Sequence, residues 1–244
     1  MRAPLIFVIA LALAHAASAN PCTEETFEGS RFSVCAADTK AHDIALAWAD
    51  SSGAPYRAFH IYAAKNDTKT VRFAMNAGMF HFDGRPVGLL KIEGRDIGRL
   101  STKDGPGNFH MKPNGVFYIA ANGIGIEPTD TFAERTDAES ATQSGPMLLI
   151  DGALHPSFQD DGPSRLIRNG VGVRGKRKAF FVISEDPVSF GKFARLFRDR
   201  LDCTDALYFD GTVSSLWVPS QNREDKAFPF GAMVVVRDKP AKQK

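Results

Sequence analysis

The sequence has few cysteines and no excess of charge of one sign. Its 244 residues include three cysteines, 30 Lys and Arg, and 28 Asp and Glu. This balance argues against nucleic acid as a partner, because nucleic-acid binding needs a concentrated basic surface. No segment repeats, and no Pro-, Ser- or Gly-rich linker divides the chain. We therefore expect one domain over residues 20–244.

No apolar run near the N-terminus is long enough to span a membrane. The run Leu5–Leu13 is short, follows Met1-Arg2 and precedes Ala17-Ser-Ala19. This pattern is typical of a secretory signal peptide that is cleaved after Ala19. Cleavage removes one of the 30 basic residues and leaves 29 basic against 28 acidic residues, a formal charge of +1. We expect the remaining chain to be exported, either to the periplasm or out of the cell.

Several common catalytic motifs are absent. The sequence contains no Gly-x-Ser-x-Gly and no His-Glu-x-x-His, which argues against a common serine hydrolase and a helical zinc protease. The six histidines show no ligand spacing. We therefore assign no metal site and no cofactor.

The three cysteines allow more than one pairing. An exported protein meets an oxidising environment, which favours disulfides. Cys22 and Cys35 are close in sequence and are able to close a small loop, which leaves Cys203 as the odd thiol. The other pairings stay open at this point.

Apolar periodicity predicts about three times as many strands as helices, which indicates an α+β fold with mixed, largely antiparallel sheets and a few short helices. One helix is expected over Tyr56–Lys65, a brief one near Thr131–Glu134, and a longer one that Asp186 caps. Phe190, Phe193, Phe197 and Leu201 form the apolar stripe of that last helix. The expected strands are Ile44–Trp48, Val71–Met75, Val87–Glu93, Val116–Ala120, Ala141–Ile150, Ile167–Val173, Ala179–Ser184, Ala206–Phe209 and Phe228–Arg237.

Glycine and proline interrupt the strand predicted over Ala141–Ile150. Gly145-Pro146 removes a side chain and a backbone donor, so the segment is expected to be bulged or to lie at a sheet edge. A bulge here directs the side chains of Gln143 and Ser144 and frees a backbone N–H.

Asp210 directly follows the apolar run Ala206–Phe209, which is typical of a buried strand. A buried carboxylate must be paired, hydrogen-bonded or neutral, because an isolated buried charge is too costly. Asp210 is therefore a candidate functional residue. The alternative is that Asp210-Gly211 is simply a hairpin turn.

Four segments place polar residues and glycine at or within an apolar strand: Asn76–Phe80, Gln143–Pro146, Arg168–Gly170 and Asp210–Ser215. In this order they resemble the motifs of the phosphodiester glycosidase family, which run approximately Asn-Gly-Gly-Phe-Phe, Ser-Gly-Pro, an Arg-containing strand, and Asp-Gly-Gly-Gly-Ser-Ser.

A small exported bacterial branch of that family is more similar still. Its patterns Lys-Pro-Asn-Gly-Val-Phe, Arg-Asn-Gly-Val-Gly and Ala-Leu-Tyr-x-Asp-Gly match Lys112–Phe117, Arg168–Gly172 and Ala206–Gly211. The resemblance extends over about residues 32–236, so it implies one phosphodiester-glycosidase domain. The chain departs from the pattern at Ala77 and at Thr212-Val213, where the wider family has glycines.

The resemblance implies hydrolysis of the bond between the anomeric carbon of a sugar and a phosphodiester oxygen, in the cell envelope. The anomeric carbon needs a carboxylate as nucleophile or as base for water, for which Asp210 is the first candidate and Glu185 the second. Arg168 suits the phosphate, because a guanidinium binds phosphate oxygens through parallel hydrogen bonds. Lys112 and backbone amides near Gly145 and Gly211 are expected to assist.

The other residues that the resemblance places in the site would bind sugar hydroxyls or hold Asp210. They are Asn76, Gly78, Gln143, Ser144, Ser214 and Ser215. The structural alternative for them is hydrogen bonding of strand ends. The functional alternative is a non-catalytic glycan- or phosphoglycan-binding protein of the envelope, which needs the same pocket. The sugar, the aglycone and the oligomeric state stay open.

Overall fold

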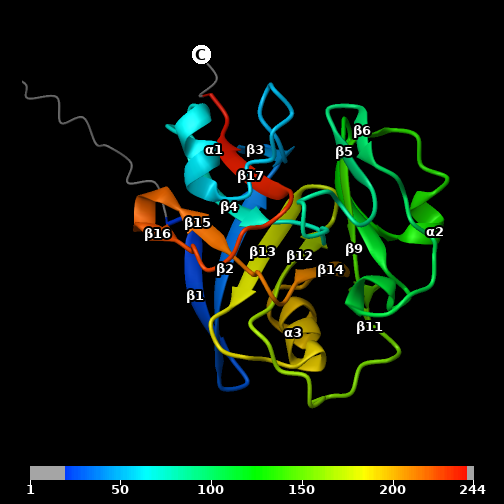
Figure 1. Ribbon diagram of the computed structural model, residues 1–244. Coiled ribbons are helices and arrows are strands. Elements are labelled where there is room, and N and C mark those ends of the chain that lie inside the picture. The colour runs from blue at the N-terminus through cyan, green and yellow to red at the C-terminus, as the bar shows by residue number, and fades with distance from the viewer. Residues whose placement is uncertain (1–19, 241–244) are drawn as a thin grey trace, which may run out of the picture.

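The computed structural model describes residues 20–240, and they form three sheets around a shared core (Figure 1). Every ladder pairing in these sheets is antiparallel, and the helices are short, which confirms the predicted fold class. The predicted signal peptide lies outside the described residues. None of the helices within residues 20–240 combines the length and apolarity needed to cross a membrane.

We name each sheet after one of its strands. The β12 sheet has seven strands in the order β1-β2-β13-β12-β14-β10-β11. Their bounds are β1 (Cys22–Phe27), β2 (Ser30–Asp38), β13 (Lys178–Ser184), β12 (Asn169–Arg174), β14 (Asp205–Asp210), β10 (Met147–Ile150) and β11 (Ala153–Leu154). Cys22 and Cys35 stand opposite each other in the β1–β2 ladder and form the disulfide, so Cys203 is the free, buried thiol.

The β4 sheet has the order β16-β15-β4-β17-β3, and the β9 sheet has the order β6-β5-β9-β7-β8. The first contains β16 (Arg223–Glu224), β15 (Leu216–Val218), β4 (Val71–Asn76), β17 (Met233–Asp238) and β3 (His42–Ala47). The second contains β6 (Arg95–Gly98), β5 (Leu90–Ile92), β9 (Ala138–Ser144), β7 (Gly115–Ala120) and β8 (Gly123–Pro128). Short 3-10 turns occupy Asn108–His110 and Pro219–Gln221.

One aromatic side chain from each sheet meets in the central core. Phe181 of β13 lies 5.6 Å from Phe73 of β4 and 5.8 Å from Phe117 of β7, measured between ring centroids. All three side chains are fully buried. Such rings contribute large apolar areas, so this contact helps to fix the mutual positions of the three sheets.

Helices cover the outer faces of two sheets. α3 (Phe190–Arg195), continued by a π-helical turn over Leu196–Arg200, packs on the β12 sheet, and α1 (Phe59–Lys65) packs on the β4 sheet (Figure 1). α2 (Thr129–Phe132) lies beside the β9 sheet.

Asp186 does not cap α3, contrary to the prediction. Ser189 is the N-cap, and its hydroxyl accepts a hydrogen bond from the backbone N–H of Lys192 at 3.2 Å. Asp186 instead accepts from the backbone and the guanidinium of Arg31, which ties the end of β13 to the start of β2. The side chains of Phe193, Phe197 and Leu201 are buried, as the predicted apolar stripe requires.

Other element boundaries differ from prediction for local reasons. The first helix begins at Phe59 and not at Tyr56, because Arg57 has a positive φ of 62° that interrupts a right-handed helix. The last strand begins only at Met233. The segment Phe228–Phe230 forms a loop instead, in which Phe230 N–H donates to the carbonyl of Arg57.

The chain leaves one sheet and enters another at Gly145-Pro146. The segment predicted as a single bulged strand is two strands, because β9 belongs to the β9 sheet and β10 to the β12 sheet. The prediction of one strand that is bulged or lies at a sheet edge was therefore wrong, because the chain changes sheets here and both strands have neighbours on either side. Gly145 is tightly packed, since a Cβ added there would lie 2.7 Å from the Phe109 carbonyl oxygen.

Candidate active site

Asp210 is the last residue of β14, and its two carboxylate oxygens have different surroundings. Oδ1 accepts hydrogen bonds from the backbone N–H groups of Gly211, Thr212 and Val213 at 2.6, 2.7 and 3.3 Å. Oδ2 has no hydrogen-bond partner within residues 20–240. The side chain is largely buried at 9% exposure. Asp210 thus organises the turn through one oxygen, and its other oxygen is left without a partner within residues 20–240.

Asn169 faces Asp210 across the β12–β14 ladder and was not predicted as a site residue. Its Nδ2 donates to the backbone oxygen of Asn76 at 2.8 Å and to the Asn76 side-chain oxygen at 2.9 Å. Both asparagines are buried. Its place in the Arg168–Gly170 motif was the available signal, but nothing local reveals a contact with Asn76 on another sheet.

The two serines after Asp210 complete this network. Asn76 Oδ1 also accepts from the backbone N–H of Ser215 at 2.8 Å. Ser214 Oγ lies 3.2 Å from Asn169 Oδ1 and 3.1 Å from the Asp210 carbonyl oxygen. The predicted residues Asn76, Asp210, Ser214 and Ser215 therefore converge, and the unpredicted Asn169 joins them.

Ser144 and the predicted glycines bring the β9 sheet to the same place. Ser144 Oγ donates to the carbonyl of Phe209, one residue before Asp210, at 3.0 Å. Gly78 N–H lies 3.3 Å from Thr142 Oγ1, and a Cβ on Gly78 would lie 2.3 Å from the Gln143 carbonyl oxygen. Gly78 and Gly145 thus permit close backbone approach beside the Asn76 and Ser144 ends of their strands.

Arg168 is fully buried and has no acidic partner within residues 20–240. Its Nε donates to the Val188 carbonyl at 2.8 Å, and Nη2 donates to the Ser164 carbonyl at 2.9 Å. Among the described residues, none provides a hydrogen-bond partner for Nη1. Burial lowers the pKa of the guanidinium, since desolvation disfavours its charge. A buried cation without a counter-ion is costly, so this position is suited to receive an anion.

A cavity of about 180 Å³ lies against the groups that hold Arg168. Its lining includes Ser164 and Phe190, and the Arg168 guanidinium lies 3.7 Å from the Phe190 ring centroid. The guanidinium also lies 5.4 Å from the ring centroid of Tyr208. Arg168 is therefore one layer below a cavity large enough for a small anion.

Tyr208 connects Arg168 to the turn that carries Asp210. A Cβ added to Gly211 would lie only 2.1 Å from the Tyr208 hydroxyl oxygen, so the turn and the hydroxyl are in close contact. The pKa of Tyr208 is raised, mainly by burial and also by the charge of Asp210, while Arg168 opposes the rise. Gly211 is thus required by packing against Tyr208.

Two predicted residues have their side chains directed elsewhere. Gln143 accepts from the N–H groups of Leu89 and Ser101 and donates to Ser101 and Thr129, so its amide joins loops of the β9 sheet. Lys112 pairs with Asp104 at 2.7 Å on the surface. A role for either residue in substrate binding stays a prediction.

Glu185 lies at the same end of the β12 sheet as Asp210, but β12 separates their strands. Its carboxylate accepts from Arg223 at 2.5 Å and from Ser33 Oγ at 2.6 Å. Its role as a second carboxylate stays a prediction. Within residues 20–240, His, Cys, Asp and Glu side chains form no group of three or more that is arranged to hold a metal.

Comparisons with known proteins point to one family. A family model described as phosphodiester glycosidase matches residues 69–237. The uncharacterized protein YigE of Escherichia coli K12 is 32% identical over 197 residues, which cover 80% of this chain and 78% of that protein.

Two solved structures share the fold. The first is the catalytic domain of zebrafish N-acetylglucosamine-1-phosphodiester alpha-N-acetylglucosaminidase, auto-inhibited by its pro-peptide, with a TM-score of 0.60 and 13% identity. That match covers 89% of this chain and 82% of the zebrafish chain. The second is a hypothetical protein from Synechocystis, with a TM-score of 0.55 and 14% identity over 89% of this chain and 61% of that one. By its sequence and its fold, this chain belongs to the phosphodiester glycosidase family.

Proposed function

We propose that this protein hydrolyses the bond between the anomeric carbon of a sugar and a phosphodiester oxygen. The observation that carries the proposal is the asymmetric carboxylate of Asp210, whose Oδ1 is held by three backbone amides while Oδ2 has no partner within residues 20–240. A fixed carboxylate with one unused oxygen is what attack on an anomeric carbon, or activation of water, requires.

The buried cation at Arg168 supports a phosphodiester as the leaving side of the substrate. Its Nη1 is an unused donor, and no carboxylate neutralises the guanidinium within residues 20–240. A phosphate in the adjoining cavity, one layer above Arg168, would be attracted by the guanidinium and would offset the cost of its uncompensated buried charge. The leaving group is a phosphate monoester, so stabilisation of its negative charge matters more than its protonation.

The polar network behind Asp210 fits the recognition of a sugar. Asn76, Asn169 and Ser214 hold the turn in one position through hydrogen bonds that run between sheets. Ser144 Oγ donates to the carbonyl of Phe209 and so ties the end of β14 to β9. Gln143, Lys112 and the amides near Gly145 and Gly211 are further proposed contacts. We propose Glu185 as the second carboxylate of the reaction.

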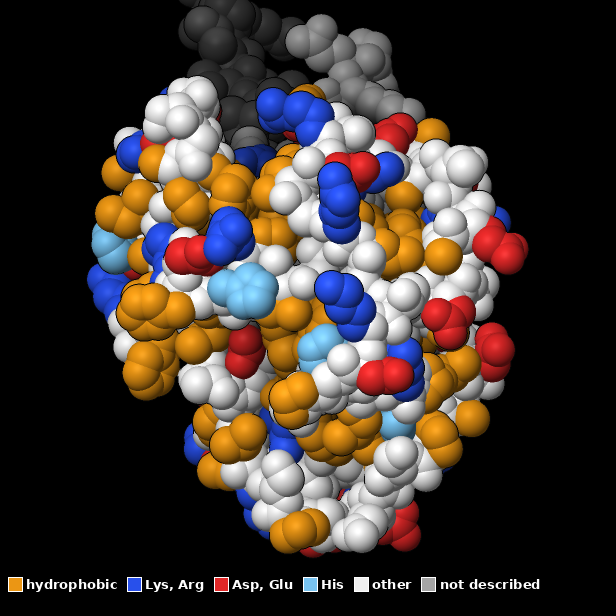
Figure 2. Space-filling model, turned by 45° about the vertical axis from the view of Figure 1, so that its right-hand side comes forward, with side chains coloured by type: hydrophobic (Ala, Val, Ile, Leu, Met, Phe, Trp, Pro, Cys, Tyr) orange, Lys and Arg blue, Asp and Glu red, His pale blue; other side chains and the backbone are white. Residues whose placement is uncertain are grey.

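The surface and the disulfide fit an exported protein that acts on a sugar phosphodiester. On the face shown in Figure 2, acidic and basic side chains are interspersed, and neither sign covers a broad area. A Cys22–Cys35 disulfide persists in oxidising compartments such as the periplasm or the cell exterior. Cleavage after Ala19 and export stay proposals.

A turnover assay tests the function. The purified protein is incubated with methyl phosphodiesters of α- and β-linked N-acetylglucosamine, glucose, mannose and galactose, and the free reducing sugar is measured. We expect release from at least one of them, and Asp210→Asn is expected to lower kcat by at least about 1,000-fold. Asp202→Asn, a change at an exposed aspartate, is the matched control and is expected to retain activity. Retained or inverted configuration of the sugar distinguishes nucleophile from base.

The second candidate function is phosphoglycan binding without turnover, which the buried Arg168 favours equally. Binding of the same phosphodiesters by wild type, with no sugar released between pH 4 and 9, would establish that alternative. Glu185→Gln in the same assay tests the second carboxylate. If Glu185 acts in catalysis, this variant is expected to bind the phosphodiesters as wild type does but to release less sugar.

A further inference from the structure

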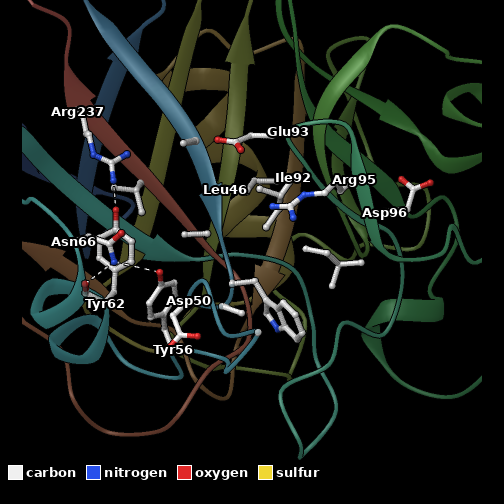
Figure 3. A pocket seen from close by; sticks show the side chains of 17 residues that line it. Leu46, Asp50, Tyr56, Tyr62, Asn66, Ile92, Glu93, Arg95, Asp96 and Arg237 are labelled. Carbon is white, nitrogen blue, oxygen red and sulfur yellow. Dashed lines mark hydrogen bonds between the residues drawn. The ribbon is translucent and has the colours of Figure 1, made fainter.

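A separate cleft of about 480 Å³ lies along β3, at the edge of the β4 sheet (Figure 3). β17 separates β3 from β4, the strand that ends at Asn76. None of the predicted site residues lines this cleft. Its volume falls within the range of ordinary ligand sites, roughly 300 to 1,000 Å³.

The floor of the cleft is small and apolar. Ala45, Ala47 and Ala49 line it. They share one face of the strand because successive side chains alternate, and Ile44 and Leu46 are buried in the central core. The alanine methyl groups therefore form a shallow apolar strip, and the larger apolar side chains of Trp48 and Ile92 also line the cleft.

The wall on the side of α1 has unused hydrogen-bonding capacity. Asn66 Nδ2 donates to the Tyr56 hydroxyl at 3.2 Å and to the Tyr62 carbonyl at 2.8 Å. Asn66 Oδ1 receives no hydrogen bond within residues 20–240, and the Tyr56 hydroxyl keeps its own proton to donate. Arg237, which donates to the Tyr62 hydroxyl, closes this wall (Figure 3).

The opposite wall is the β5–β6 hairpin. Glu93 and Arg95 flank its turn, both are exposed, and their side chains reach toward β3 (Figure 3). Neither side chain forms an ion pair within residues 20–240, whereas Asp50 on the other side of the cleft pairs with Lys65 at 2.5 Å. The hairpin thus offers one planar acceptor and one planar donor, both unoccupied.

The combination of floor and walls restricts the chemistry of a ligand. Acids and arginines both line the cleft, so neither anions nor cations are favoured as a class. A purely apolar ligand would bury the unpaired polar groups of both walls, which is costly. A sugar ring has an apolar C–H face and a rim of hydroxyls, and vicinal hydroxyls pair well with planar carboxylate, amide and guanidinium groups.

We propose that the β3 cleft is a binding site for a neutral oligosaccharide. A ring lies with its C–H face on the alanines, and its hydroxyls pair with Glu93 and Arg95 on one wall and with Asn66 and Tyr56 on the other. This inference does not depend on hydrolysis at Asp210, since a protein without turnover would bind glycans there in the same way.

Titration of isotope-labelled protein with cellotetraose, chitotetraose and mannotetraose, followed by amide NMR, tests the site. We expect saturable shifts at 45–50 and 93–97 with at least one probe. Ala47→Phe fills the floor, and Arg95→Ala removes a donor to the ligand; each is expected to raise Kd about tenfold or more. Arg99→Ala, in an exposed residue that does not line the cleft, is the matched control and is expected to leave Kd unchanged.

The Asp210→Asn variant separates this site from the catalytic one, because binding at β3 is expected to persist in it. The proposal is overturned if no probe binds saturably, if the shifts map to 208–215 instead, or if both Ala47→Phe and Arg95→Ala bind as wild type does. Thermal unfolding shows whether each variant is folded. Should Ala47→Phe fail to fold, Arg95→Ala and Glu93→Gln decide the question.

Discussion

Asn169 on β12 uses one amide nitrogen to hold Asn76, 93 positions earlier in the chain, by both its backbone oxygen and its side-chain oxygen. The side-chain oxygen of Asn76 also accepts a hydrogen bond from the backbone N–H of Ser215. One buried side chain thus joins the β12 sheet, the β4 sheet and the turn that carries Asp210. Removal of this side chain affects stability and the site together.

Asn169→Ala is expected to lower the free energy of unfolding by about 2 to 4 kcal/mol, because it removes the buried amide that donates to the Asn76 backbone oxygen and is one of two donors to the Asn76 side-chain oxygen. Urea unfolding measures the change. Asn122→Ala, in the exposed β7–β8 turn, is the control and should stay within about 0.5 kcal/mol of wild type. A loss under about 1 kcal/mol at Asn169 would contradict the network.

Gly211→Ala and Tyr208→Phe are expected to be coupled. The new Cβ of the first variant meets the Tyr208 hydroxyl at 2.1 Å, and the second variant removes that hydroxyl. Gly211→Ala alone should cost about 1 to 3 kcal/mol of stability through steric strain. The double variant should be more stable than the sum of the single effects by at least about 1 kcal/mol. Additive losses in urea unfolding would exclude this contact.

His155 is expected to make stability depend on pH. Burial lowers its pKa below 6.5, so between the two values the unfolded chain binds more protons than the folded one. The stability that the neutral His155 contributes to the folded state is therefore complete above pH 6.5 and is lost as the pH falls below that value. The loss of unfolding free energy from pH 7.5 to 5.5 should be larger in wild type than in His155→Gln, by on the order of 1 kcal/mol.

His81→Gln, at an exposed histidine, provides the comparison for that experiment and should keep the pH dependence of wild type. Other titratable groups affect the unfolding free energy equally in wild type, His155→Gln and His81→Gln, so their effect cancels when the pH dependences are compared. Equal pH dependence in wild type and His155→Gln would show that His155 is not responsible.

Cys203 is expected to be unreactive in the folded protein. Its thiol is buried, and burial raises its pKa to about 12, so it stays protonated at pH 8. Ellman's reagent should find almost no thiol in the native protein, one thiol after unfolding in guanidinium, and three after unfolding and reduction. Cys203→Ser should show no thiol until reduction. A rapid reaction of the native wild type would contradict the buried position.

Local sequence was sufficient for those features that depend on neighbouring residues. The apolar run before Asp210 indicated a buried strand end, and the structure places the carboxylate there with its turn. The alternative of a simple hairpin turn was wrong, because the strands before and after this turn, β14 and β15, belong to different sheets. A functional role for the other carboxylate oxygen stays a prediction. The helix after β13 was found, but its cap was not, because Arg31 of another strand engages Asp186.

Features that depend on distant residues were not accessible. The β1–β2 hairpin was missed because its edge strand contains the adjacent acidic residues Glu24 and Glu25 and shows little apolar alternation. Asn169 lies within the Arg168–Gly170 motif, but no role was predicted for it, because its partner Asn76 lies on another sheet. Lys112 points outward and Gln143 contacts loops because of side-chain packing, which the periodicity of the sequence does not predict.

The passage of the chain from β9 to β10 at Gly145-Pro146 means that the site belongs to no contiguous part of the protein. Asn76, Ser144, Asn169 and Asp210 come from three sheets and are separated by long stretches of chain. Contacts between such distant residues are expected to form late in folding, because closing the long intervening loops has an entropic cost. A partly folded chain therefore carries no assembled site. The proposed site is therefore expected to exist only in the fully folded protein.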